Sequence, residues 1–595
     1  MIASEVLKDY FLRELAALRE GATRFAQDFP VVAGQLALQG GRSKDPQVEL
    51  LLQSFAFLTG QLRHAMDVQD ATLPGQLLEA LNPQLACPLP AMAVLQVAIG
   101  GGDANFALRN SLPAHTEMAT QARWKGAEQR CRFRTMEPLE LWPIEVTAVE
   151  PCPLQELPPR LVPQGTMAAL RLRLSSLGPA FHEMPITSLR FFLDGPYRYE
   201  LYDALSGSLL AVISAGPGAA GARLVTPARG QPGTPGLSAV EEEEVEAPAH
   251  PGLARLREYF ACPERFLFHS VDGLSLQGQG SELELIWLFS SACPPVRRED
   301  VRLNCVPIAN LYRQRVEPLV LRAGRVEYPL VGDRQRHGTC EIHSLRSLSL
   351  REPSGRECPL GPLYGSALQA EAAEAFWSLR REVSQLPSVP GTESWVSFVD
   401  RDFLPGLKEG STVGGSAWCT DRRLPESLEV GARMRLAPGA VAREGVLLTQ
   451  PSLTQAPALS GDGVRRLCAQ LSDHCLPLSG GADSLARLKE VLAQHFEPHD
   501  ARARQQLAGL TRLSHARVAE RTGQEAWHGL SVGVKLTLTV DRSAYRESSA
   551  LLFGDVLSEC FAGFAPLNGF VRLEMVGARG ELLKLWPARS RMGAG

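Results

Sequence analysis

The chain has 595 residues, with 61 basic and 65 acidic side chains and a formal net charge of −4 at pH 7. This balance provides no global field that would draw the chain to nucleic acid or to an anionic membrane. No uninterrupted run of about 18 apolar residues occurs, and Glu5, Lys8 and Asp9 stand where a signal peptide needs an apolar segment. We therefore expect a cytoplasmic chain without membrane insertion, with roughly three to five domains at about 100 to 200 residues each.

Two amphipathic helices are predicted within the first eighty residues. The first has Ser4 as its N-cap and ends at Phe29-Pro30, and the second starts at the cap Asp45 with Pro46 in its first turn. We expect a helical hairpin in which both apolar stripes pack on each other and on the next domain, with a partner-binding face as the alternative. The stripes are Leu7, Phe11, Leu15, Leu18, Ala22, Phe25 and Phe29, and then Val48, Leu51, Leu52, Phe55, Leu58 and Leu62.

A β-rich region is predicted next, because the apolar period changes to two after the prolines at positions 83, 88 and 90. Leucine and arginine alternate over residues 170–174, which places the leucines on a buried face and the arginines on a solvent or partner face. Residues 214–251 are rich in Gly, Pro and Ala and include four consecutive glutamates at 241–244. This composition predicts a long loop or an excursion between two strands, which no core stabilises.

The second half of the chain mixes both periods. Strands are predicted at 283–289, 301–303 and 326–330, and a helix at 368–381, where Ala, Glu and Leu dominate. Residues 409–416 and 450–460 are candidate joins because they are rich in Gly and Ser or in Pro. The last segments predicted are helices at 464–471 and 484–496, a strand at 534–540, a helix at 551–564 and a strand at 571–575.

These elements predict an α+β fold: an elongated multidomain protein with an N-terminal helical hairpin, several β-rich domains and a C-terminal mixed α/β unit. The expected domains are a helical region (1–86), a β-rich domain that ends in the 214–251 loop (87–250), a β-rich middle domain (251–365), a mixed connecting domain (366–460) and a C-terminal α/β domain (461–595).

An aromatic run interleaved with charges occupies residues 253–269. Tyr259, Phe260, Arg265, Phe266 and Phe268 are the interface candidates of this chain, because the centres of protein interfaces are enriched in aromatic residues and Arg. The same pattern is typical of an ordinary core helix that enters a strand. The sequence leaves both interpretations open.

Signatures of catalysis are missing from the sequence, which has no phosphate-binding G-x-x-x-x-G-K-[ST], no H-E-x-x-H and no G-x-S-x-G. Glu140 with Glu145, or Asp400 with Asp402, could serve as the carboxylate pair of a glycosidase, so a soluble carbohydrate-active hydrolase is one alternative function. A standalone module that binds peptide or glycan through the aromatic run is another. We predict no catalytic residue.

Cysteine usage points to a reduced interior, since the twelve cysteines include no C-x-x-C pair. Neither of two candidate ligand sets completes the four ligands of a structural zinc site, so we predict no metal and no cofactor. The two sets are His337, Cys340 and His343, and then Cys468, His474 and Cys475.

A family resemblance runs nearly from end to end of the chain. Its blocks are Tyr10-Phe11 with Arg13-Glu14-Leu15, Phe29-Pro30, residues 131–135 before Leu141-Trp142-Pro143, the aromatic run 253–269, and the stretches 303–311, 419–425 and 552–557 through Leu585-Trp586-Pro587. In this order they resemble TssF, the baseplate subunit family of the bacterial type VI secretion system, also called ImpG or VasA. The chain departs from that family at Cys262, where an aromatic is more usual, and in the low-complexity segment 216–251.

The resemblance implies a non-enzymatic structural subunit without cofactors. Such a subunit builds baseplate wedges with TssG, with two copies of this chain for each TssG, and is related to the wedge proteins of contractile phage tails. The implied further partners are TssK, TssE and the central spike, around which the wedges initiate sheath assembly and transmit contraction. The implied location is the cytoplasmic baseplate, docked at the inner membrane through other subunits.

Overall fold

The computed structural model describes residues 2–99, 110–217, 220–225, 250–363, 373, 375–386, 388–400, 407–438, 440, 442–459, 461–472, 483–521, 530–566 and 569–590. The chain forms two compact units, each assembled from stretches that lie far apart in the sequence. Unit 1 comprises Met1–Pro88, Arg313–Arg423 and Gln455–Ala469, and unit 2 comprises Leu89–Tyr312, Leu424–Thr454 and Gln470–Gly595. The mixture of helices and several sheets confirms the predicted α+β class.

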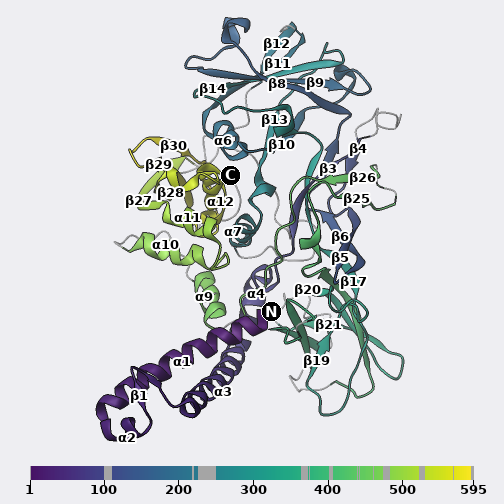
Figure 1. The fold of residues 1–595 in the computed structure, drawn as a ribbon. Helices are drawn as coiled ribbons and strands as arrows, with labels where there is room; N and C mark the ends of the chain where they lie inside the picture. The colour runs from purple at the N-terminus through teal and green to yellow at the C-terminus, as the bar shows by residue number, and fades with distance from the viewer. Residues whose placement is uncertain are drawn as a thin grey trace. The chain divides into compact units, whose positions relative to one another are not determined.

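Unit 1 begins with a helical hairpin of two long antiparallel helices (Figure 1). Its elements are α1 (Ile2–Asp28), α2 (Pro30–Gln35), β1 (Leu38–Gln39), β2 (Arg42–Ser43), α3 (Pro46–Asp70), α4 (Thr72–Leu81) and α5 (Pro83–Ala86). The predicted cap of the second helix is confirmed, because the Asp45 carboxylate accepts a hydrogen bond from the Gln47 amide at 2.9 Å. The predicted N-cap at Ser4 is wrong, since α1 already begins at Ile2.

An 8-stranded sheet forms most of the rest of unit 1, in the order β17-β24-β20-β21-β22-β23-β19 with β18 beside β24. The strands are β17 (Tyr312–Arg315), β18 (Leu319–Val320), β19 (Glu327–Leu330), β20 (Glu341–Arg351), β21 (Glu357–Pro362), β22 (Ala375–Val383), β23 (Thr392–Asp400) and β24 (Thr412–Thr420). The helix α9 (Gly461–Ser472) starts in this unit.

Two predictions fail in this sheet. The helix predicted at 368–381 is wrong for residues 375–381, which belong to β22 and pair in parallel with β21 and antiparallel with β23. Sheet pairing on both sides outweighs the helical propensity of Ala, Leu and Glu. The flexible join predicted at 409–416 is also wrong in its second half, because Thr412–Ser416 lies within β24 and pairs with β20.

A closed six-stranded barrel forms the first part of unit 2, in the order β16-β3-β26-β25-β5-β6. The strands are β3 (Met92–Val97), β5 (Glu117–Trp124), β6 (Ala127–Thr135), β16 (Cys305–Ala309), β25 (Arg433–Leu436) and β26 (Glu444–Leu447), and the pair β4 (Asn110–Leu112) and β7 (Leu139–Leu141) accompanies them. Its interior is filled by side chains such as Leu95, Phe133 and Met434. The strands of the barrel come from three of the five predicted domain ranges, so the predicted boundaries do not delimit the barrel as one domain.

Two further sheets of unit 2 have the orders β12-β11-β14-β9-β8 and β13-β10-β15. Their elements are β8 (Ile144–Pro151), β9 (Ala168–Ser176), β10 (Ser188–Leu193), α6 (Arg198–Asp203), β11 (Leu209–Gly216), β12 (Ala220–Val225), α7 (Pro251–Ala261), β13 (Phe268–Asp272), β14 (Glu282–Phe289) and β15 (Val301–Arg302). The loop predicted from residue 214 is wrong at its start, where β11 and β12 pair antiparallel. Residues 226–249, including the acidic run, lie outside the described residues.

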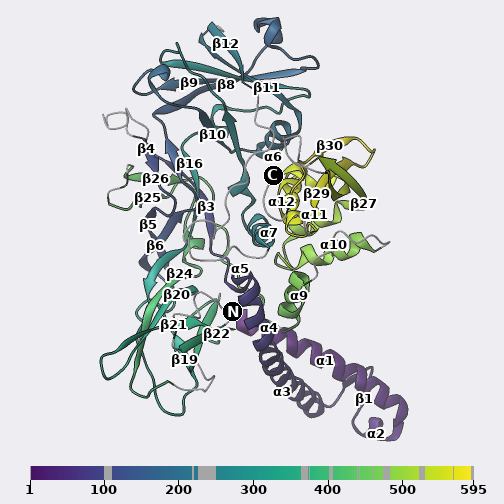
Figure 2. The same ribbon diagram turned by 180° about the vertical axis from the view of Figure 1, so that it is seen from behind.

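The C-terminal part of unit 2 is the predicted strand-helix-strand unit. The described elements are α10 (Ser484–Ala493), α11 (Ala501–Ala508), β27 (Leu510–Arg521), β28 (Leu530–Val540), α12 (Ala550–Ala562), β29 (Phe570–Gly577) and β30 (Leu582–Leu585). β28 and β29 pair in parallel, and Figure 2 shows the connecting helix α12 against the sheet. α7 packs on α12 so closely that a Cβ at Gly252 would lie 2.5 Å from the Cα of Cys560.

A buried carboxyl on α6 joins this helix to the start of α12. Asp203 accepts hydrogen bonds from the Ser549 hydroxyl and from the Leu551 amide, the second at 3.4 Å. Burial raises the pKa of Asp203 to about 6. Because the ordinary pKa of aspartate is about 4, folding takes up a proton between these two values, and the native state loses stability as the pH rises through this window.

Replacing Asp203 with asparagine, which does not titrate, removes this loss. We compare the free energy of unfolding of the variant with that of the native chain at two pH values. The difference between the two proteins should shift in favour of the variant by about 3 kcal/mol between about pH 4 and about pH 7.5. Thermal or urea unfolding of both proteins at the two pH values measures this change. An equal difference at both pH values would contradict the assignment.

Candidate partner interface

The two long helices of unit 1 pack through small residues. On α3, Ala56 is fully buried, and a Cβ at Gly60 would lie only 3.1 Å from the backbone nitrogen of Phe11 on α1. Side chains without bulk at these positions let the two backbones approach closely. The face of α3 that meets α1 is therefore the face with small residues, not the face with leucines.

Polar contacts fix the hairpin on either side of this seam. The Tyr10 hydroxyl donates to Asp67 at 2.7 Å, Arg19 and Glu49 form an ion pair at 2.9 Å, and Arg63 pairs with Glu14. Burial, followed by the hydrogen bond to Asp67, raises the pKa of Tyr10 to about 12. These contacts set the rotation of α3 about its own axis, and so decide which residues it turns to solvent.

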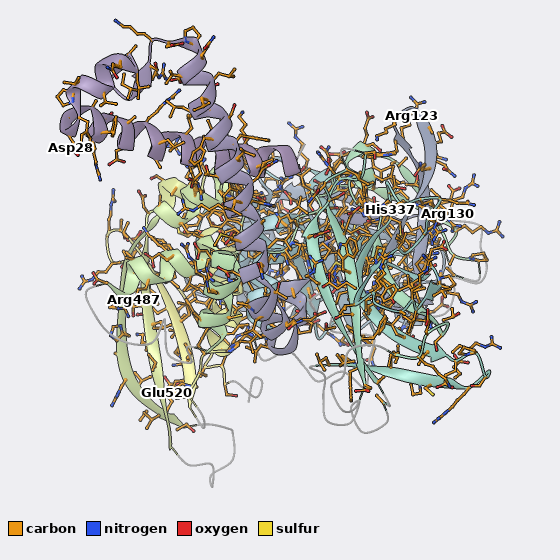
Figure 3. The ribbon with its side chains drawn as sticks, turned by 90° about the horizontal axis from the view of Figure 1, so that it is seen from below. Asp28, Arg123, Arg130, His337, Arg487 and Glu520 are labelled. Carbon is orange, nitrogen blue, oxygen red and sulfur yellow. The ribbon has the colours of Figure 1, made fainter. Side chains whose placement is uncertain are left out.

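The side of α3 that is turned to solvent carries a continuous apolar stripe, which we call the α3 face. Its spacing of three or four residues places all members on one ridge of the helix. The α3 face consists of Leu51, Phe55, Leu58, Leu62 and Met66, whose exposed fractions are 71%, 54%, 61%, 62% and 56%. Leu73 and Leu77 on α4 are exposed as well. Figure 3 shows the hairpin with its side chains.

The prediction that the second helix buries its stripe is therefore wrong for Leu51, Phe55, Leu58 and Leu62. The alternative of a partner-binding face agrees with the structure. A soluble chain rarely exposes this much contiguous apolar surface unless another chain covers it. The small residues Ala56 and Gly60 between the leucines were a sequence signal for close packing on that side of the helix. A period of 3.6 alone does not say which side meets the neighbouring helix.

The five candidates from the aromatic run all lie in the interior of unit 2. Tyr259, Phe260, Phe266 and Phe268 are buried in the α7 region, and Tyr259 stacks on Phe553 of α12 with ring centroids 5.6 Å apart. Burial raises the pKa of Tyr259 well above its ordinary value. This placement favours the interpretation as a core helix that enters a strand. An interface role for these residues stays a prediction, and it would require the unit to open.

Arg265, the fifth candidate, is fully buried and forms an ion pair with the equally buried Glu258 of α7. Its guanidinium also lies over the ring of Phe266, 4.8 Å from the centroid. A buried pair of this kind contributes to stability only because each charge compensates the other. The pair therefore locks α7 to the turn that follows it.

The candidate metal ligands are engaged in other contacts. His337 lies 3.3 Å from Glu393, the imidazole of His343 lies 3.0 Å from the Ser344 hydroxyl, and the Cys468 thiol lies 3.3 Å from the Pro74 carbonyl oxygen. Among the described residues, no group of three or more His, Cys, Asp or Glu side chains could hold a metal ion. His474 and Cys475 lie outside those residues.

The structure describes three of the four candidate glycosidase carboxylates, Glu140, Glu145 and Asp400. Glu145 forms an ion pair with Arg298. Glu140 pairs in register with Ser111 on the neighbouring strand, and Asp402 lies outside the described residues.

Substituting Gly60 with leucine tests the hairpin seam. We expect a loss of about 1–3 kcal/mol of stability, because the new side chain would meet the backbone of α1. Gly21 on α1 is the matched control, since a Cβ there has nothing within 4 Å. Gly21→Leu should leave the stability unchanged or raise it by up to about 1 kcal/mol through helix propensity. Equal urea midpoints for the two variants would contradict the close packing of α3 on α1 at Gly60.

The fold and this surface define the class of the protein: a multi-sheet α+β protein with a helical hairpin that exposes an apolar face. No helix in the described part of the chain is long and apolar enough to cross a bilayer.

Comparison with known proteins narrows this class to a family. The profile of the family described as "Type VI secretion system, TssF" matches residues 3–593. The protein "Type VI secretion system component TssF1" of Pseudomonas aeruginosa is 30% identical over 620 residues, which cover 98% of this chain and 98% of that protein. The chain therefore belongs to the TssF family of the type VI secretion system, and the family predicted from the sequence is confirmed.

Solved structures show a similar fold. A chain of the type VI secretion system TssK-TssF-TssG baseplate subcomplex, determined by cryo-electron microscopy, matches with a TM-score of 0.68 at 21% identity and covers 91% of this chain and 98% of its own length. A chain of the baseplate complex from the type VI secretion system matches with a TM-score of 0.57 at 20% identity and covers 98% of this chain and 99% of its own length. The arrangement of helices and sheets described above is thus the fold of a baseplate subunit.

Proposed function

We propose that the chain is a structural wedge component of the type VI secretion baseplate, that it acts by assembly and not by catalysis, and that the α3 face is its principal docking surface. The observation that carries this proposal is the apolar stripe of five large side chains, each more than half exposed on a helix whose rotation is fixed. Burying each of them contributes about 1 kcal/mol, so the stripe supplies about 5 kcal/mol to a complex.

The proposed partners are TssG and TssK, which are named together with TssF in the solved subcomplex of similar fold. A helical partner suits the α3 face, because ridges spaced three and four residues apart pack into the grooves of a second helix. TssG is our choice for this face. A second copy of this chain, TssE and the central spike complete the proposed set, and the proposed location is the cytoplasmic baseplate, held at the inner membrane by other subunits.

The family and the curated relative that the comparisons identify give no support to the alternatives of a carbohydrate-active hydrolase or a module that binds peptide or glycan. A wedge with two copies of this chain for each TssG would place the copies in unequal surroundings, so some of its joints would differ between the two copies.

Co-expression of the chain with the TssG protein of the same organism, followed by light scattering coupled to size exclusion, tests the proposal. We expect a stable complex whose mass equals two copies of this chain and one TssG. A chain that stays monomeric in the presence of TssG would overturn the proposal, and a complex with equal copies would overturn the proposed stoichiometry alone.

A further inference from the structure

The C-terminal sheet of unit 2 has a long open edge. Its strand order is β27-β28-β29-β30, so β27 has a neighbouring strand on one side only in the described part of the chain. The strand has 12 residues, and about half of its backbone N–H and C=O groups therefore point away from the sheet. Among the described residues, no backbone group of residues 511–521 bonds to the backbone of any element other than β28. Figure 1 shows β27 as the outer strand of this sheet.

The edges of the other open sheets that the structure describes are shorter. The 8-stranded sheet ends in β17 and β19, each of four residues, and β19 contains Pro329. The 5-stranded sheet ends in β12, of six residues, and in β8, of eight residues with Pro151 as its last. Short length and proline are common means of keeping an edge strand from pairing with another chain. β27 has neither feature.

The middle of β27 is exposed on both faces of the sheet. Leu513, His515 and Arg517 share the face that carries the buried Leu536 of β28. Leu513 is buried, but all of residues 514–517 are exposed. The cover over this face therefore ends after Leu513, and the strand beyond it is open to a second chain.

The charge along β27 is positive and unbalanced. The strand holds three arginines and one glutamate, and that glutamate, Glu520, is ion-paired with Arg572 of β29. Arg512 and Arg517 are exposed, and neither has an ion-pair partner among the residues that the structure describes. In the strand register, both lie opposite uncharged residues of β28. A strand added at this edge would meet two cations that the sheet itself does not neutralise.

We propose that β27 pairs with an extended acidic segment of a partner protein, which adds a fifth strand to this sheet. Main-chain hydrogen bonds along the edge supply the affinity, and carboxylates beside Arg512 and Arg517 supply the selectivity. The two arginines are five residues apart and so lie on opposite faces of the sheet. The carboxylates of the partner segment must therefore be five residues apart as well. This surface is separate from the α3 face, and its test does not depend on that face.

A second copy of this chain is a poor occupant of the edge. Each copy of β27 would bring three arginines and one glutamate to the pairing, and like charges on neighbouring strands are destabilising. Charged residues on an edge strand commonly prevent such self-pairing. The arginines of β27 thus exclude a strand like itself and favour a strand of opposite charge.

Fluorescence anisotropy with labelled twelve-residue peptides tests this inference on the full-length chain. The first peptide is built from Thr and Ser with two Glu residues five positions apart, and the second has the same composition with the Glu residues four positions apart. We expect the first peptide to bind roughly two- to fivefold more tightly, because only its carboxylates reach both faces of the sheet. Equal affinities, or no binding of either peptide, would overturn the proposal.

Methylation of the peptide backbone tests the main-chain pairing. Every second amide of a paired segment points to β27, and the others point away from it. Two forms of the first peptide carry N-methyl groups on one or the other set of alternate residues. We expect one form to bind at least roughly tenfold more weakly and the other form to bind like the parent peptide. Equal losses for both forms would overturn pairing through the backbone.

Variants of the chain locate the site. Arg512→Glu with Arg517→Glu should weaken binding of the first peptide roughly tenfold, because both favourable charge pairs become repulsive. The matched control, Arg487→Glu with Arg504→Glu, reverses two exposed arginines on α10 and α11 and should leave the affinity unchanged. Equal affinities of the native chain and the β27 variant would overturn the assignment to this edge. Dimers of the free chain that the peptide dissociates, detected by light scattering, would overturn it in favour of a second copy.

Discussion

Placing glutamate at both Leu58 and Leu62 abolishes complex formation with TssG and leaves the fold of the free chain intact. Both side chains are exposed in the free chain, so their carboxylates face water there and cost the fold little. In a complex, the same carboxylates would be buried against apolar groups, at a cost of several kcal/mol. We expect an affinity loss of roughly a hundredfold or more, measured by titration calorimetry or co-purification.

The controls for this variant change two exposed valines that lie away from the α3 face. Val326 in unit 1 and Val532 in unit 2 are as exposed as Leu58, and glutamate at either position should leave the affinity for TssG unchanged. Circular dichroism melting confirms that each variant is folded. A Leu58→Glu, Leu62→Glu variant that is folded and binds TssG like the native chain would remove the α3 face from the account.

The largest effect on stability should come from the buried ion pair of unit 2. Replacing Arg265 with methionine removes the cation of this ion pair, while the Glu258 carboxylate stays buried. We expect a loss of about 3–5 kcal/mol of stability. Hydrogen exchange of the α7 amides in increasing urea measures the stability of this region directly.

Two control variants test whether the loss of stability comes from the burial of the ion pair. Replacing both partners, with Arg265→Met and Glu258→Leu, should restore much of the loss, since the buried carboxylate is then removed together with the cation. Arg24→Met breaks the ion pair with Glu20, which is exposed at the surface, and should cost less than about 1 kcal/mol. Equal losses for the buried and the exposed pair would contradict the account of Arg265.

Local signals in the sequence predict element boundaries well in this chain. Phe29-Pro30 ends α1, and Asp45-Pro46 starts α3 through a side-chain cap. Strict alternation likewise identifies β28, and the structure shows that it pairs in parallel with β29 across the helix between them. These features depend on residues close together in the chain, which is why the sequence alone suffices for them.

Features that depend on distant partners escape this reasoning. The barrel closes because β3 pairs with both β16 and β26, strands that lie hundreds of residues away from it. β22 has helix-forming residues and becomes a strand because β21 and β23 flank it.

The proposed docking surface shows the same limit. The apolar period of α3 is clear in the sequence, but the hairpin seam uses Ala56 and Gly60 and turns the larger side chains outward. The aromatic run has the composition of an interface centre and lies in the core, since composition does not distinguish the two. The family resemblance indicated the function, and the packing of α1 on α3 showed which side of α3 is exposed.

The most direct test of the central claim is hydroxyl-radical footprinting of the chain alone and in complex with TssG. Met66 and Phe55 on the α3 face carry readily oxidised side chains that are exposed in the free chain. The account predicts strong labelling of both residues in the free chain and protection in the complex, with unchanged labelling of the exposed Met167 in unit 2. Equal labelling of Met66 and Phe55 in both states would show that TssG binds elsewhere and would contradict the account.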